Sequence, residues 1–252
     1  MKGLGVNARR QFLRSTTVLG TGLLLGGCGD KGAGERRSDD QAPADKAGSK
    51  AEVEVTAVED LMREHGVLRR ALFVYTEAAA RLRSDPATVA LETLQKVAML
   101  FRAFGEDYHE KKLEEAHIFP AVRKAGGEAA GCVEVLIAQH QRGREITDYI
   151  LKTTQSGRSG AAGADELVRM LDSLVRMYRP HAAREDTVVF PAWKQALTVA
   201  QLDEMGDKFE DIERAQFGED GFENAVKQIA EIEASLGLAD LGQFTVSSPP
   251  VR

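Results

Sequence analysis

Cysteine is scarce in this chain, which has only Cys28 and Cys132 among its 252 residues. Two cysteines are too few for a disulfide framework or for a metal site built from thiolates. The sequence around Cys28, described below, marks it for modification, which leaves Cys132 as a single thiol. The sequence therefore excludes folds held by internal disulfides and metal centres with thiolate ligands.

Long apolar runs and strand patterns are also missing. The apolar stretch Val18–Gly27 is much shorter than the ~20 residues that span a bilayer. No sustained alternation of apolar and polar residues, which would indicate a strand, follows it. Without residues 1–27, which contain four basic residues and no acid, the net charge changes from −6 to −10. So acidic a chain is not expected to bind nucleic acid or an anionic bilayer as its main partner.

The first 54 residues are typical of an export signal and a tether. The sequence RRQFLR at positions 9–14 resembles a twin-arginine signal, and LGGC at positions 25–28 resembles a lipoprotein cleavage site. We therefore expect an export signal over residues 1–27, a flexible tether over residues 28–54, and an extracytoplasmic or periplasmic protein anchored to the membrane through a lipid on Cys28. The alternative is a cytoplasmic protein with a disordered basic start.

The region 55–196 has apolar residues in steps of three and four, which is the spacing of one helix face. Breaks at Ser84-Asp85-Pro86, at Gly126-Gly127 and at the glycine-rich residues 156–163 divide it into four helices. We predict an all-α protein in which these helices form an up-down-up-down bundle. A helical hairpin is expected over residues 197–238, opened by a capping box at Thr198, and a loose tail over residues 239–252.

Each of the four apolar stripes includes one histidine. These are His65, His109, His140 and His181. The second and fourth helices add a glutamate about one turn later, and each glutamate precedes a Phe-Pro pair. Aligning the two Phe-Pro pairs places Glu114 on Glu185, so the halves of the region resemble a duplicated helical hairpin.

A lone histidine on an apolar stripe is usually a hydrogen-bonded core residue. Four histidines and two glutamates buried together are costly unless they pair or bind something. A pair of metal ions would resolve this cost, because imidazoles supply nitrogen ligands and carboxylates bridge and neutralise. Ligands of this kind suit iron or manganese, with zinc as a further candidate.

The motifs that carry these residues resemble the hemerythrin-like HHE cation-binding family. The resemblance runs from about Val55 to Trp193 and rests on DLMREH (60–65), YH (108–109), EE (114–115), FP (119–120), QH (139–140), PH (180–181), ED (185–186) and FP (190–191). It implies a four-helix bundle around two non-haem iron ions that react with O2 or a related small ligand. The resemblance also implies that the four histidines named above are metal ligands and that Glu114 and Glu185 bridge the ions.

Two departures from the family pattern leave alternatives open. Glu114 follows His109 by five residues, whereas Glu185 follows His181 by four. A local bulge could explain this spacing, or Glu110 could replace Glu114 as the ligand. Arg144 stands where the invertebrate oxygen carriers have a further histidine, which favours sensing, redox or storage over reversible O2 carriage.

Three functions remain open at this point. The first is an exported di-iron protein that binds or senses O2, NO or peroxide. The second is an oxidase or peroxidase on the same scaffold, with Tyr178 beside a ligand as a candidate for an outer hydrogen bond. The third is a metal-free helical interaction module. The sequence does not indicate an oligomeric state.

Overall fold

The computed structural model describes residues 55–155, 161–218 and 221–249. Within these ranges every regular element is a helix, so the predicted all-α class is confirmed. None of these helices has the length and apolar character that crossing a membrane requires. The export signal predicted for residues 1–27 and the tether predicted for residues 28–54, including Cys28, lie outside the described residues.

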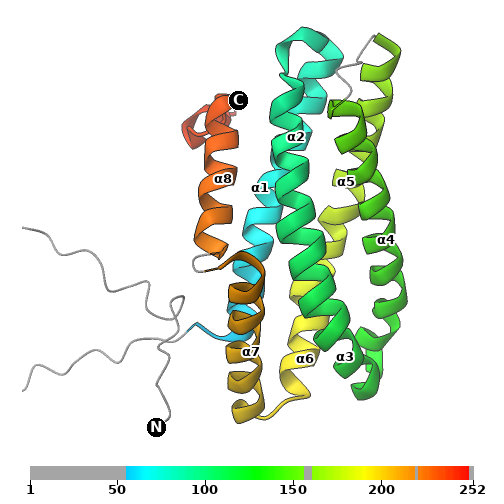
Figure 1. The fold of residues 1–252 in the computed structure, drawn as a ribbon, viewed down its shortest axis with the longest axis vertical. Helices are drawn as coiled ribbons and strands as arrows, with labels where there is room; N and C mark the ends of the chain where they lie inside the picture. The colour runs from blue at the N-terminus through cyan, green and yellow to red at the C-terminus, as the bar shows by residue number, and fades with distance from the viewer. Residues whose placement is uncertain (1–54, 156–160, 219–220, 250–252) are drawn as a thin grey trace, which may run out of the picture.

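Four long helical segments run up and down side by side and form the predicted bundle (Figure 1). The first is α1, and a short 3-10 turn follows it. The second and fourth are each continuous through a stretch of π-helix. Their bounds are α1 Ala57–Ser84, the 3-10 turn Pro86–Thr88, α2 Leu91–Leu100, π-helix η3 Phe101–Ile118, α3 Phe119–Ala125, α4 Gly127–Gln155, α5 Ala161–Arg184, π-helix η4 Glu185–Val189 and α6 Phe190–Gln195.

Local sequence explains where these segments begin and turn. Thr56 caps α1 through a capping box, in which its side chain accepts from the Glu59 N–H and the Glu59 carboxylate accepts from the Thr56 N–H. Gly126 and Gly127 both have positive φ, 79° and 77°, a backbone region that favours glycine. The predicted turn between the second and third segments is therefore confirmed at these two residues.

The π-helical stretches explain the uneven spacing of the two glutamates. Phe119 N–H donates to the Glu114 carbonyl, and Phe190 N–H donates to the Glu185 carbonyl, so both bonds span five residues. In η3 the five-residue step from His109 to Glu114 therefore stays close to one face of the helix. The bulge considered from the sequence is the arrangement found.

The prolines account for the wide turn at the end of each π-helix. Pro120 and Pro191 each follow the phenylalanine that makes the five-residue bond. A proline ring inside a regular α-helix clashes with the carbonyl four residues earlier and removes one hydrogen bond. Widening the turn just before each proline relieves that clash, so the repeated Phe-Pro pairs and the repeated π-turns belong together.

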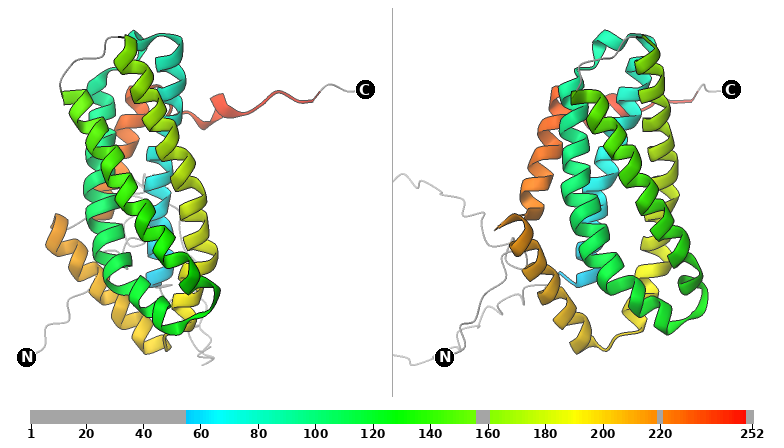
Figure 2. Two further views of the ribbon diagram at one scale, coloured as in Figure 1. Left: turned by 90° about the vertical axis from the view of Figure 1, so that its right-hand side faces the viewer. Right: turned by 45° about the vertical axis from the view of Figure 1, so that its right-hand side comes forward.

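The C-terminal helices differ from the predicted hairpin. α7 (Val199–Phe217) and α8 (Gly221–Ser235) follow one another in the same direction along the bundle, and do not fold back on each other (Figures 1 and 2). Ring contacts and a side-chain hydrogen bond trace the path, which runs antiparallel to the second segment: His117 with Phe209, Lys112 with Gln216, Tyr108 with Phe217 and Phe104 with Phe222.

α7 and α8 do not form a hairpin because each helix packs its apolar face against the bundle. In α7, Phe209 stacks on the buried Trp193 at 5.7 Å between ring centroids. In α8, Phe222, Ile229 and Ile232 are buried against α1 and α2. No apolar stripe is left on either helix to hold a hairpin together. The predicted capping box of Thr198 with Gln201 is confirmed.

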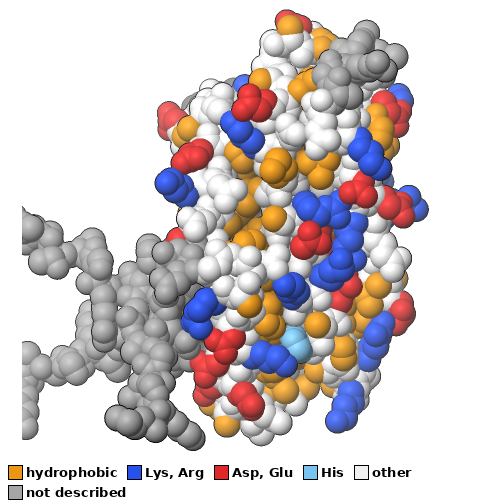
Figure 3. Space-filling model, viewed as in Figure 1, with side chains coloured by type: hydrophobic (Ala, Val, Ile, Leu, Met, Phe, Trp, Pro, Cys, Tyr) orange, Lys and Arg blue, Asp and Glu red, His pale blue; other side chains and the backbone are white. Residues whose placement is uncertain are grey.

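Beyond α8, Leu236 and Leu238 are buried, and the chain over residues 239–249 is exposed. It forms a 3-10 turn, Leu241–Phe244, and the Phe244 ring packs edge-on against Phe73 of α1 at 5.1 Å. On the face in Figure 3, charged side chains of both signs are interspersed, and apolar side chains line the seam between α8 and α2. A hollow of about 450 Å³ lies in this seam, with Met99, Phe104 and Phe217 among its lining residues.

Close approach of α4 and α5 depends on one glycine, which gives a stability prediction. A Cβ at Gly143 would overlap the Tyr178 hydroxyl, whereas a Cβ at Gly131 of the same helix would meet nothing within 4 Å. We expect Gly143→Ala to lower the free energy of unfolding by about 1–3 kcal/mol through overpacking.

Gly131→Ala is the matched control, because alanine favours a helix interior over glycine. It should raise the free energy of unfolding by up to about 1 kcal/mol. Thermal and denaturant unfolding of the two variants would check this, and equal effects would contradict the packing described.

Candidate metal centre

The four predicted histidines meet in the middle of the bundle, one from each long segment. His65 comes from α1, His109 from η3, His140 from α4 and His181 from α5. None is more than 4% exposed. The His65 and His109 rings lie 4.7 Å apart between centroids, and the His140 and His181 rings lie 4.8 Å apart. The structure therefore arranges them as two pairs.

Glu114 and Glu185 lie between the two pairs, and each directs one oxygen to each pair. On the first side, Glu114 Oε1 is 3.3 Å from His109 Nε2 and Glu185 Oε2 is 3.5 Å from His65 Nε2. Both carboxylates are completely buried.

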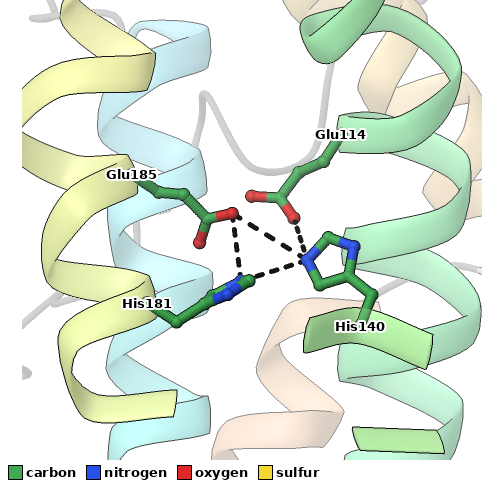
Figure 4. A group of neighbouring side chains, drawn as sticks. All are labelled: Glu114, His140, His181 and Glu185. Carbon is green, nitrogen blue, oxygen red and sulfur yellow. Dashed lines mark hydrogen bonds and ion pairs between the residues drawn. The ribbon is translucent and has the colours of Figure 1, made fainter. Parts of the chain in front are cut away.

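The second side has the same arrangement. Glu114 Oε2 is 3.3 Å from His140 Nε2, and Glu185 Oε1 is 3.1 Å from His181 Nε2 (Figure 4). Each side thus presents two imidazole nitrogens and one oxygen from each glutamate. This is the donor set that two bridged cations require.

The outer nitrogen of every ring has its own partner, which fixes the ring with Nε2 pointing inward. His65 Nδ1 lies 2.7 Å from Asp186 Oδ1, and His140 Nδ1 lies 2.9 Å from Glu115 Oε1. The other two pairs are His109 Nδ1 with Glu64 Oε2 at 2.6 Å and His181 Nδ1 with Gln139 Oε1 at 2.9 Å. Metal-binding histidines usually have such partners, which orient the ring and raise its basicity.

The two halves of the site are related residue by residue. Arg69, four residues after His65, pairs with Asp186, and Arg144, four residues after His140, pairs with Glu115 at 2.6 Å. Arg144 therefore has a structural role here, as a partner of carboxylates, at the position where the oxygen carriers have a histidine.

The phenylalanine of each Phe-Pro pair packs against a histidine from the other half of the repeat. Phe119 stacks on His140, with ring centroids 5.6 Å apart, and Phe190 lies 5.3 Å from His65. Each Phe-Pro pair thus shields a histidine that belongs to the other half of the repeat.

Glu110 and Tyr178 lie beside the cluster. Glu110 accepts a hydrogen bond from the Tyr178 hydroxyl at 2.6 Å and one from Arg144 at 3.1 Å. Its nearest approach to a histidine of the cluster is 3.9 Å, from Oε2 to His140 Nδ1. Glu114, not Glu110, is the carboxylate that η3 directs between the pairs. The Tyr178 ring packs edge-on against His181, with ring centroids 5.2 Å apart, while its hydroxyl donates to Glu110.

Burial and mutual charge strongly perturb the pKa values of the central groups. Burial disfavours protonated His140, but Glu110, Glu114 and Glu115 outweigh it and raise its pKa to about 10. Burial and the charge of His140 lower the pKa of His181 to about 4. Burial, together with the charge of Glu114, raises the pKa of Glu185 to about 8. Without a cation, the cluster therefore balances its carboxylates with bound protons.

The chemistry of the donor set fits a metal. Within the described residues, both oxygens of Glu114, both oxygens of Glu185 and Nε2 of His109 are buried without a hydrogen-bond partner. Leaving a buried polar group without a hydrogen-bond partner costs about 1–3 kcal/mol, and more where the group is charged. All five atoms face the same centre, where cations would satisfy them together.

A small cavity adjoins the cluster. Its volume is about 10 Å³. Its lining includes the apolar Leu68, Leu72 and Phe101, together with Tyr178, His65, His109, His181, Glu110, Glu114 and Glu185. A space of this size is close to that of a single water molecule. Only a very small ligand would fit in this space beside the cluster.

Four residues that orient the rings were not singled out from the sequence for that role. They are Glu64, Gln139, Glu115 and Asp186. The repeat contained a signal for them: Glu64 and Gln139 each precede a histidine, and Glu115 and Asp186 each follow a central glutamate. Their partners lie on other helices, so the pairing itself required the fold.

Comparison with known proteins supports this assignment. The chain is 46% identical over 197 residues to "Uncharacterized protein Rv1995" of Mycobacterium tuberculosis (strain ATCC 25618 / H37Rv) and to "Uncharacterized protein Mb2018" of Mycobacterium bovis (strain ATCC BAA-935 / AF2122/97). Each alignment covers 78% of this chain and 76% of the relative. No solved structure matches the chain. The family described as hemerythrin HHE cation-binding domain matches residues 56–193, which is more than half of the chain and contains the whole cluster. The chain therefore belongs to the hemerythrin HHE cation-binding family.

Proposed function

We propose that this protein binds two non-haem iron ions in the bundle and uses them to bind or sense O2 or a related small ligand such as NO or peroxide. The observation that carries the proposal is the pair of buried glutamates, whose oxygens are divided between two pairs of inward-facing imidazole nitrogens. His65 and His109 would hold one ion, and His140 and His181 the other. Glu114 and Glu185 would bridge them.

The donor types support iron. Imidazole and carboxylate without thiolate suit iron or manganese, and zinc remains a candidate by affinity. When bound, an iron pair supplies redox chemistry toward O2 and its relatives. The chain itself holds the donors in place, excludes bulk water with Phe119 and Phe190, and leaves a cavity of about 10 Å³ beside the centre. That volume favours a diatomic or peroxide-sized ligand over a larger substrate.

Metal content and ligand binding test the proposal directly. Protein expressed with ample iron should contain about two iron ions per chain, and addition of azide or O2 should produce ligand-to-iron charge-transfer bands. Glu114→Gln should lower iron content and abolish the bands, because a bridging oxygen is lost from the centre.

Asp107→Asn is the matched control, since Asp107 lies on the same π-helix with a side chain that is 40% exposed. This variant should keep its iron and its bands. Iron-free wild-type protein after expression in iron-rich medium would contradict the proposal. Turnover of added peroxide by the wild type, lost in Glu185→Ala, would favour the peroxidase alternative over simple binding.

Metal binding should release protons at pH 7. The raised pKa values of His140, about 10, and Glu185, about 8, mean that both groups are protonated at neutral pH without a cation. Each must lose its proton to become a ligand, so apparent affinity should rise as pH increases from about 6 to 8.

Calorimetric titration with a divalent metal ion in buffers of different ionisation enthalpy measures this release. The slope of the observed enthalpy against the ionisation enthalpy gives the number of protons. A slope of zero, or an affinity that falls with increasing pH, would be inconsistent with the charges described for the centre.

Removing the metal should destabilise the fold, because the bound ions stabilise only the native state. At a free metal concentration about 100 times Kd, this stabilisation is about 2.7 kcal/mol, or about 5–10 °C in Tm for a chain of this size. A chelator should therefore lower Tm of the loaded wild type by about that amount, and should leave Glu114→Gln nearly unchanged. A wild-type Tm that does not respond would favour the metal-free interaction module.

A further inference from the structure

The hydrogen-bond partners of the outer ring nitrogens correspond between the two halves of the centre, but one corresponding pair of partners differs in charge. His109 has the carboxylate of Glu64 on its outer nitrogen, at 2.6 Å. The corresponding partner of His181 is the neutral amide of Gln139, at 2.9 Å. Both partners occupy the position just before a central histidine, Glu64 before His65 and Gln139 before His140. The sequence duplication thus conserves the contact and changes its charge.

The remaining outer contacts are balanced between the halves. His65 is backed by Asp186, which pairs with Arg69, and His140 is backed by Glu115, which pairs with Arg144. These two carboxylate–arginine arrangements have the same charge. They therefore do not distinguish one half of the centre from the other.

We infer that Glu64 and Gln139 make the two metal positions unequal, so that the position of His65 and His109 binds a cation more tightly than that of His140 and His181. This inference rests on the proposed function. A carboxylate that accepts the outer proton of an imidazole increases electron density at the inner nitrogen, and an amide oxygen does so less. Loss of such a partner usually lowers metal affinity by about 10–100-fold. Glu64 and Gln139 are therefore positioning residues that tune their ligands and do not touch the ion.

The hydrogen bonding of Glu64 holds its carboxylate in place for this role. Its other oxygen, Oε1, accepts a hydrogen bond from the Tyr108 hydroxyl at 3.0 Å, so the carboxylate is fixed between Tyr108 and His109. Glu64 is 1% exposed, and water does not screen its charge from the ring. A glutamine at this position could still accept from His109 and meet the tyrosine, so Glu64→Gln changes the charge with little change in shape.

Glu110 has the opposite effect on the two positions, because its charge favours a cation at the position of His140 and His181. It is buried near His140, in the half of the centre where the partner of His181 is an amide and not a carboxylate. Arg144 and Tyr178 both donate to it, which offsets part of its charge. Glu110 stays unchanged in the variants below, so differences among them arise from the residues at positions 64 and 139.

Reciprocal exchange of charge tests the inference. Native mass spectrometry of the metal-free full chain, titrated with Co²⁺, gives the populations with no, one and two ions, and hence two stepwise binding constants. Their ratio should fall in Glu64→Gln, which weakens the tighter position, and also in Gln139→Glu, which strengthens the weaker one. If the positions differ by about 10–100-fold, the expected fall is about 3–25-fold.

The ratio of the two stepwise binding constants distinguishes an effect of Glu64 and Gln139 on metal affinity from a merely structural effect. Damage to the bundle would weaken both binding steps together, and cooperativity through the bridging glutamates affects the ratio equally in all three proteins. The double variant Glu64→Gln, Gln139→Glu should bring the ratio back to the wild-type value or above it, because it moves the carboxylate to the other half, where Glu110 acts in the same sense. A ratio that is unchanged or that rises in either single variant would overturn the inference alone. Failure of any variant, and of the wild type, to take up a second ion would overturn the proposed function as well.

Discussion

The structure depends on a group of carboxylates and imidazoles that point at one another inside a helical bundle. Glu114 and Glu185 are fully buried, and none of their four oxygens has a hydrogen-bond partner among the described residues. Such an arrangement is unfavourable in a low-dielectric interior, because like charges repel and none is hydrated. Protons reduce the cost in part, as the raised pKa of Glu185 indicates. Cations between the two carboxylates would remove it.

The residues and the backbone around the centre hold its side chains in this arrangement. The inner nitrogens can face a cation only if the outer ones are held, so each ring has an acceptor on another helix. Three of those acceptors are in turn fixed by Arg69, Arg144 and Tyr108. The backbone also adapts, since the π-turns before Pro120 and Pro191 bring the glutamates onto the inner face. Helix geometry, side-chain pairing and the placement of proline all serve the same centre.

Much of this could be predicted from the sequence, because helix periodicity and the repeat are local signals. The bundle, the turn at Gly126-Gly127, the Thr198 capping box and the convergence of the four histidines with Glu185 follow from residue type and spacing. The choice between Glu110 and Glu114 did not, because it depends on whether the helix between His109 and Pro120 is α or π. A regular 100° step turns Glu114 away from the histidines, and the wider turn brings it back.

The C-terminal helices show the limit of local reasoning. Two amphipathic helices joined by a short turn are typical of a hairpin, and the stripes of α7 and α8 fit one equally well. The outcome depends on a competing surface, since Trp193, Tyr108 and Phe104 offer aromatic partners along the second and fourth segments. The two helices gain more by packing on that surface than on each other. The choice between these packings depends on which tertiary contacts are more favourable, and the periodicity of apolar residues does not predict that.

The duplication also clarifies which differences between the halves matter. Where both halves share a residue type, as in the Phe-Pro pairs and the arginines four residues after His65 and His140, a common structural demand is sufficient explanation. Where two corresponding residues make the same contact but differ in type, a structural requirement shared by both halves does not explain the difference. Glu64 and Gln139 occupy corresponding positions, are hydrogen-bonded to corresponding nitrogens and have similar shapes. Packing would accept either residue at either position, so the difference in charge is best understood through what the two histidines bind.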